Sequence, residues 1–200
     1  MPNPIDFYFD FSSPYGYLAA QRIDAIAEEH GRRVRWHPFL LGVALKISGG
    51  QPLVFRELLG DYSLLDLKRC ARKYNIDYQI PSTFPVPTQA AARAYWWLHD
   101  IDEAAAIDLA KALYSAYFAQ DHNIQEPEVV LDIAAQCGHD RQTLEAALQD
   151  DAVKQRLKDV TNGAIKRGVF GSPYFFVDDE PFWVNDRLEH LDEWLRSGGW

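Results

Sequence analysis

Ser13 is a candidate functional residue, because its hydroxyl lies where a strand pattern changes into a helix pattern. Pro14 follows it, and serine at the N-cap before a first-turn proline is typical of a helix start. Free backbone N–H groups and the helix dipole suit such a start to an anion. Without a histidine beside it, a serine is a poor nucleophile, but its hydroxyl can donate a hydrogen bond to a thiolate. We therefore expect Ser13 to stabilise an anion rather than to attack a substrate.

The elements that must position Ser13 are a strand before it and a helix after it. Residues 4–10 have the period-two pattern of a strand, and residues 14–30 have the spacing of a helix that Gly31 ends. Residues 33–37 alternate again and stop at Pro38. Because a helix separates the two strands, we expect them to be parallel, as in a βαβ unit.

The rest of the chain is helical until strand signals return near residue 173. Helix patterns cover residues 64–75, 89–99, 102–120, 127–138, 141–149 and 151–167. Residues 173–184 predict a hairpin whose turn is Asp178–Pro181, and a helix over about 186–197 ends the chain. There is no internal repeat or linker, so we expect the helical block to be an insertion.

Composition and charge exclude several classes of function. The net charge of −9 argues against binding of nucleic acid or an anionic membrane as the main role. No apolar run reaches the roughly 18 residues of a membrane span, and with no targeting signal visible we expect a cytoplasmic protein. Cys70 and Cys137 lie far apart without a CxxC motif, so we interpret them as packed thiols. No metal or nucleotide motif is present, and we expect no bound metal.

Three stretches carry a resemblance to a known family. The turn Phe9–Leu18 resembles the active-site turn of thioredoxin-fold proteins, and more narrowly that of kappa-class glutathione transferases and 2-hydroxychromene-2-carboxylate isomerases. The stretch Gly168–Val177 resembles the segment with the cis-proline of that fold. The stretch Phe182–Leu188 resembles the Phe-Trp-Gly-Asn-Asp-Arg-Leu signature of the isomerases.

The resemblance implies an α/β, thioredoxin-like fold with a large all-helical insertion, as in DsbA-like proteins. Residues 1–38 and 151–200 would form a discontinuous thioredoxin-like domain, and residues 39–150 the helical insertion. Ser13 and Gly16 stand where redox members carry the two cysteines of CxxC, so disulfide chemistry is nearly excluded.

The resemblance also implies glutathione as the cofactor. Its binding residues would be Ser13, Tyr15 through its N–H, Ser172 through its main chain, the cis-proline Pro173, Trp183, Asn185 and Asp186. The Asp186 carboxylate would pair with the ammonium of the γ-glutamyl end, although a plain helix cap is the alternative interpretation. Lys46 would lie near the anionic substrate.

The family chemistry predicts a glutathione-dependent isomerase that interconverts 2-hydroxychromene-2-carboxylate and trans-o-hydroxybenzylidenepyruvate, in aromatic catabolism. A glutathione thiolate stabilised by Ser13 would add to an unsaturated carbon and leave after bond rotation. The alternatives are a kappa-class-like transferase or peroxidase and, less favoured, a non-catalytic binding protein. Family members are usually homodimers. Gly50, Pro87 and Val184 depart from the family pattern, so the second substrate stays open.

Overall fold

The period-two pattern around Phe7 forms β1 (Ile5–Phe9), an inner strand that is buried along its whole length. In the computed structural model, which describes residues 3–200, it belongs to a four-stranded sheet in the order β2-β1-β3-β4. The parallel neighbour is β2 (Val34–Pro38) and the antiparallel one is β3 (Tyr174–Val177). The antiparallel β4 (Glu180–Trp183) is the second edge strand. The predicted parallel βαβ unit and the hairpin are thus confirmed.

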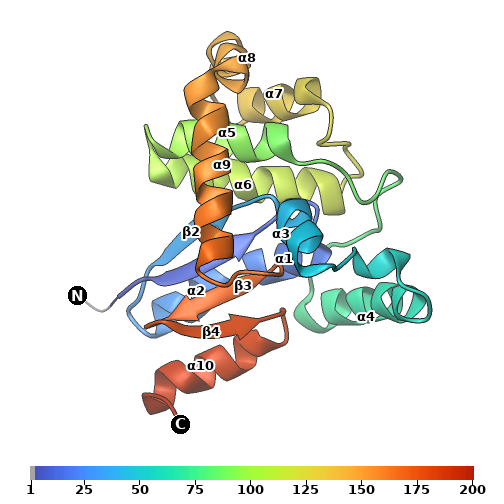
Figure 1. Cartoon of the computed structure of the whole chain (residues 1–200), viewed down its shortest axis with the longest axis vertical. Helices are drawn as coiled ribbons and strands as arrows, with labels where there is room; N and C mark the ends of the chain where they lie inside the picture. The colour runs from blue at the N-terminus through green and yellow to red at the C-terminus, as the bar shows by residue number, and fades with distance from the viewer. Residues whose placement is uncertain (1–2) are drawn as a thin grey trace.

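The helices surround this sheet, and Figure 1 shows α5 to α9 gathered at one end of the molecule, with α10 at the other end beside β4. The α-helices are α1 (Pro14–Ala20), α2 (Ile23–Glu29), α3 (Leu41–Ser48), α4 (Leu59–Tyr74), α5 (Gln89–His99), α6 (Glu103–Phe118), α7 (Pro127–Gln136), α8 (Arg141–Gln149), α9 (Asp151–Lys166) and α10 (Arg187–Ser197). A short 3₁₀ turn covers Leu53–Phe55. None of the helices described is both long and apolar enough to cross a membrane.

The two faces of the sheet pack into separate apolar clusters. Phe7 and Phe9 point into the larger one, which includes side chains of α1, α5, α6 and α10. Tyr8 and Phe176 point to the other face, where they pack with Phe39 and with residues of α3 and α9. The alternation in β1 therefore separates two buried faces rather than a buried face from an exposed one.

The predicted helices omit α3 and the first turn of α4, and two further boundaries are wrong. The helix expected over residues 14–30 is two helices, broken where Arg22 leaves helical geometry and stacks its guanidinium 3.6 Å above the Tyr74 ring of α4. The hairpin turn is only Asp178 and Asp179, both with positive φ, and Pro181 lies within β4. Proline is acceptable there because β4 is an edge strand. The division into residues 1–38 with 151–200 and residues 39–150 stays a prediction.

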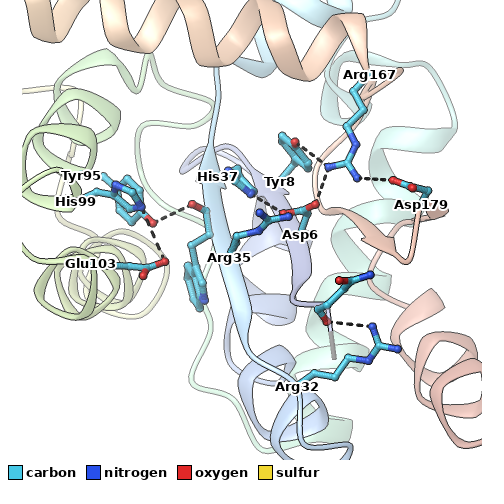
Figure 2. Close-up of polar contacts among 12 residues, drawn as sticks. Asp6, Tyr8, Arg32, Arg35, His37, Tyr95, His99, Glu103, Arg167 and Asp179 are labelled. Carbon is cyan, nitrogen blue, oxygen red and sulfur yellow. Dashed lines mark hydrogen bonds and ion pairs between the residues drawn. The ribbon is translucent and has the colours of Figure 1, made fainter. Parts of the chain in front are cut away.

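A buried carboxylate, Asp6 of β1, joins three elements (Figure 2). Its side chain lies 2.8 Å from Arg35 Nε, 2.9 Å from His37 Nε2 and 2.6 Å from Arg167 Nη1. Burial alone would raise the pKa of Asp6, but the hydrogen bonds from His37, Arg167 and Arg35 hold it well below 3.8. The ion pairs fasten the end of α9 to the centre of the sheet.

We predict that Asp6→Asn lowers the free energy of unfolding at neutral pH by roughly 2–3 kcal/mol, somewhat less than the cost of breaking a fully buried pair, because the arginine heads are partly solvated. Asp179→Asn is the control, because that carboxylate also pairs with Arg167 but its side chain is 96% exposed. The control substitution should change stability by less than about 1 kcal/mol. Urea denaturation of the three proteins measures both effects.

The sign of the pH dependence follows from the lowered pKa of Asp6. Its contribution is fully present above the unfolded value near 3.8, and it declines as the pH falls below that value. The difference in unfolding free energy between wild type and Asp6→Asn should therefore shrink only below about pH 4. A difference that shrinks already between pH 7 and 5 would contradict this assignment.

Candidate active site

Ser13 caps α1, as its sequence position predicts. Its Oγ accepts a hydrogen bond from the Gly16 N–H at 3.1 Å and donates one to the Ser172 carbonyl at 2.9 Å. The Tyr17 N–H donates a hydrogen bond to the Ser13 carbonyl, whereas the Tyr15 N–H makes no hydrogen bond within residues 3–200. Ser13 itself is only 6% exposed. Its hydroxyl proton can serve a ligand only after turning away from Ser172.

The loop before β3 faces this turn. Its Ser172–Pro173 peptide bond is cis, as the resemblance implies. The Ser172 carbonyl accepts from Ser13, and the Ser172 Oγ accepts from the Asp10 N–H at 2.9 Å. Ser172 thus contributes its side chain as well as its main chain, which the sequence analysis did not foresee.

Asp10 lies under the turn and is buried, with 6% of its surface exposed. Its carboxylate accepts from the N–H groups of Ser12 and Leu41, both at 2.8 Å, and from the Thr88 hydroxyl at 3.0 Å. Burial raises the pKa of Asp10, since these hydrogen bonds only partly offset the loss of water. The site therefore contains a buried acid that the sequence analysis missed. The signal for it was a charged residue between two apolar ones, Phe9 and Phe11.

The position of Gly16 has no room for a side chain. A Cβ there would lie 2.6 Å from the Tyr114 hydroxyl and 3.0 Å from the Ser172 Oγ. Tyr114 is fully buried and donates to the Asp10 carbonyl at 2.9 Å, so it is held in place. The tyrosine hydroxyl thus fills the space into which a side chain at Gly16 would extend.

Trp183 lies against the same loop. Its indole covers Gly171, where an added Cβ would lie 2.0 Å from the indole nitrogen. It also meets the Phe170 ring at a centroid distance of 4.7 Å, and 48% of the residue remains exposed. The register of the hairpin, which pairs Tyr174 with Trp183, places this tryptophan beside Ser172 and Pro173.

Asn185 and Asp186 open α10 without capping it. Asn185 is 1% exposed, and its Oδ1 is buried without a hydrogen-bond partner in the described part of the chain. The Asp186 side chain makes no capping bond to the helix and lies 3.1 Å from the exposed Arg187 guanidinium. The cap interpretation of Asp186 is therefore wrong, and a carboxylate and a guanidinium stand side by side at the helix start. Arg187 was not among the predicted site residues.

Tyr15 lies on α1 and Lys46 on α3. The Tyr15 hydroxyl donates to Asp66 of α4 at 3.0 Å, and burial together with that carboxylate raises its pKa. Tyr15 can therefore offer a ligand its N–H but not a free hydroxyl. Lys46 is exposed on α3 and makes no ion pair within residues 3–200.

A groove of about 510 Å³ opens beside the predicted residues at the start of α10. Its lining is rich in tryptophan and comprises Glu180, Pro181, Phe182, Trp183, Val184, Asp186, Arg187, Trp194 and Trp200. A larger groove of about 750 Å³ lies between α1, α6 and the end of α4, and it contains none of the predicted site residues. The smaller groove is lined by Val184 and Asp186, the two neighbours of the unpaired Asn185 in the chain. Within residues 3–200, no group of three metal-ligating side chains is arranged around a common point.

Val184, which precedes Asn185, has a φ of +79°. The left-handed region costs an L-residue about 1–2 kcal/mol, and a β-branched side chain suits it least. The backbone there fits the glycine that the resemblance places in the Trp-Gly-Asn-Asp run. The strain lies directly beside the candidate site, where strained backbone is common.

We predict that Val184→Gly is more stable than Val184→Ala by about 1 kcal/mol, because alanine keeps the left-handed penalty and glycine does not. Alanine is the matched control, since both variants lose the branched side chain. The midpoints of urea denaturation at equal slope measure the difference. If the alanine variant is as stable as the glycine variant or more stable, the backbone at residue 184 is not strained.

Comparisons with known proteins find relatives along nearly the whole chain. The model of the DSBA-like thioredoxin domain matches residues 4–196. A 2-hydroxychromene-2-carboxylate isomerase of Pseudomonas putida is 31% identical over 94% of this chain and 92% of its own length. Glutathione S-transferase kappa 1 of Caenorhabditis elegans is 24% identical over 96% of this chain and 91% of its own. A solved 2-hydroxychromene-2-carboxylate isomerase structure superposes with a TM-score of 0.86 at 29% identity, covering 94% of this chain and 92% of that one.

Proposed function

Because the chain belongs to the DSBA-like thioredoxin family and, within it, to the 2-hydroxychromene-2-carboxylate isomerases, we propose that it interconverts 2-hydroxychromene-2-carboxylate and trans-o-hydroxybenzylidenepyruvate with glutathione as cofactor. Membership confirms the predicted fold, a DsbA-like thioredoxin fold with helices inserted after β2. The chain is accordingly an enzyme of the isomerase family. The reaction and its substrate are the parts that we propose.

The observation that supports glutathione most is the buried, unpaired Oδ1 of Asn185. An unpaired buried oxygen costs stability, and the ammonium of a γ-glutamyl group would satisfy it. Asp186 would pair with the same ammonium, and Arg187 with the adjacent carboxylate of the ligand. The positive end of the α10 dipole favours that carboxylate further. The residues at this helix start therefore fit the amino-acid end of glutathione.

At the central cysteine of the ligand, Ser13 and Tyr15 would hold the sulfur. When bound, glutathione supplies a thiolate for reversible addition to the conjugated double bond of the substrate. The Tyr15 N–H would donate to the sulfur, and the Ser13 hydroxyl would join it by turning its proton away from the Ser172 carbonyl. Thiols at helix starts have lowered pKa values, so α1 favours the reactive form. Ser172 and Pro173 would shape the path between the γ-glutamyl end and the sulfur.

The substrate is a planar aromatic anion, and two features of the chain fit it. Lys46 carries a free positive charge on α3, and its ammonium would pair with the substrate carboxylate. The exposed face of Trp183 offers a flat apolar surface. The proposal includes a homodimer and a cytoplasmic location; the two free thiols, Cys70 and Cys137, are consistent with that location.

The second candidate is a kappa-class-like glutathione transferase or peroxidase. It is favoured by the similarity to glutathione S-transferase kappa 1 along nearly the whole chain. Both candidates use the same glutathione site, and they differ in the second substrate. A non-catalytic binding role finds less support, because both sets of relatives are named as enzymes.

Calorimetric titration with reduced glutathione tests the proposed cofactor. We expect saturable binding to the wild type, and binding weakened at least tenfold in Asp186→Ala, because a hydrogen-bonded charge pair is lost. Glu193→Ala removes an exposed charge from the same helix and should bind like the wild type. Absence of binding at millimolar glutathione would contradict both enzyme candidates.

An absorbance assay of 2-hydroxychromene-2-carboxylate with catalytic glutathione then separates the candidates. The isomerase converts the substrate without consuming glutathione, whereas a transferase consumes one equivalent per turnover. Lys46→Ala should raise KM for the carboxylate while leaving glutathione affinity unchanged, because the lysine faces only the second substrate in this proposal. An unchanged KM would remove Lys46 from the site.

A further inference from the structure

The hydrogen-bond partners of Asp10 come from more elements than a residue that only caps a helix would join. The three donors to its carboxylate come from different elements. Ser12 lies in the turn before α1, Leu41 is the first residue of α3, and Thr88 comes directly before α5. The main chain of Asp10 adds bonds to Ser172 and Tyr114. One buried residue therefore joins the Ser13 turn, the Ser172 loop and the helix that carries Lys46.

The chemistry of this position requires a carboxylate. Oδ1 accepts from the Ser12 N–H and the Thr88 hydroxyl, while Oδ2 accepts from the Leu41 N–H. No cation pairs with Asp10 within residues 3–200, so these donors alone compensate its charge. An amide has only one acceptor atom. In either orientation, asparagine would turn its NH₂ group toward a backbone N–H and leave that N–H unpaired.

From this geometry we propose that Asp10 is a positioning residue, which fixes the distance between the Ser13 turn and Lys46 by holding the first N–H of α3. The proposal rests on the proposed function insofar as Lys46 binds the substrate anion. The γ-glutamyl end of glutathione would lie at Asn185 and Asp186, just before α10, and neither these residues nor α10 donate to the Asp10 carboxylate. Breaking the bond between Asp10 and Leu41 should therefore affect the second substrate more than the γ-glutamyl end of glutathione.

The first test is Asp10→Asn, with Thr88→Val as matched control. Valine has the shape of threonine and removes one donor to Asp10, but it leaves the bonds to the turn and to α3 intact. In Asp10→Asn we expect KM for the chromene carboxylate to rise roughly tenfold, the equilibrium effect of one unpaired backbone amide. Glutathione affinity should fall less than substrate affinity, because the bonds of Ser13 to Gly16 and Ser172 do not involve the Asp10 carboxylate. Irreversible loss of folded protein would lower the apparent kcat and the calorimetric stoichiometry but leave KM and glutathione affinity unchanged. Reversible unfolding would raise KM and the glutathione dissociation constant by one common factor.

Amide hydrogen exchange gives a readout that does not depend on activity. The amides of α3 should exchange on the order of tenfold faster in Asp10→Asn than in the wild type, after normalisation to the α6 amides, which report global unfolding. In Thr88→Val, the normalised α3 exchange should equal that of the wild type.

A second pair of variants approaches the same bond from α3, in case Asp10→Asn does not fold. Leu41→Pro removes the N–H that reaches Asp10, and proline is favoured at the first position of a helix. Leu40 is already extended, with φ −89° and ψ 96°, which suits a residue before proline. Leu41→Ala keeps the N–H and serves as the control for the lost side chain.

Faster α3 exchange with a selective rise in KM, in Asp10→Asn or in Leu41→Pro relative to Leu41→Ala, supports the proposal. Normalised α3 exchange that matches the wild type in the folded variants overturns it. An equal loss of glutathione and substrate affinity overturns it as well. If the wild type binds no glutathione, the proposed function fails, and the exchange rates alone still decide whether Asp10 positions α3.

Discussion

The candidate site depends on two hydrogen bonds between segments about 160 residues apart. The Asp10 N–H donates to the Ser172 Oγ, and the Ser13 Oγ donates to the Ser172 carbonyl, both at 2.9 Å. They continue the antiparallel pairing of β1 with β3 beyond the last ladder pair, Tyr8 with Tyr174. Because the sheet fixes where β3 begins, it also fixes where the loop meets the N-terminus of α1. The hairpin then brings the start of α10 to the same end of the sheet.

An acidic chain with a net charge of −9 must attract an anionic ligand through local charge. In our proposal three positive features attract the ligands: the N-terminus of α1, the N-terminus of α10 with Arg187, and Lys46 on α3. The negative groups beside them are compensated. Asp186 lies next to Arg187, and Asp10 is enclosed by three donors. This separation of charge lets an acidic surface coexist with a site for glutathione and a carboxylate substrate in our proposal.

Local patterns predicted most of the fold, because the periods of strands and helices depend on neighbouring residues. The prediction failed where distant contacts decide the conformation. At the break between α1 and α2, Arg22 stacks on Tyr74 of the distant α4, and Pro181 could join a strand only because β4 lies at the edge. Motifs predicted Ser13, Pro173 and Asp186 as candidate site residues. The partners of Asp10 come from three separate elements, so its role could be recognised only after these elements were placed together.

The central claim is that the start of α1 stabilises a thiolate, and the most direct measurement is the thiol pKa of bound glutathione. Thiolate absorbance in the ultraviolet, followed against pH with the ligand saturated, gives this value in the wild type and in Ser13→Ala. The account predicts a bound pKa at least one unit below the roughly 8.5 typical of a free cysteine thiol, and a partial return toward that value in Ser13→Ala. Equal and unshifted values in both proteins would contradict it.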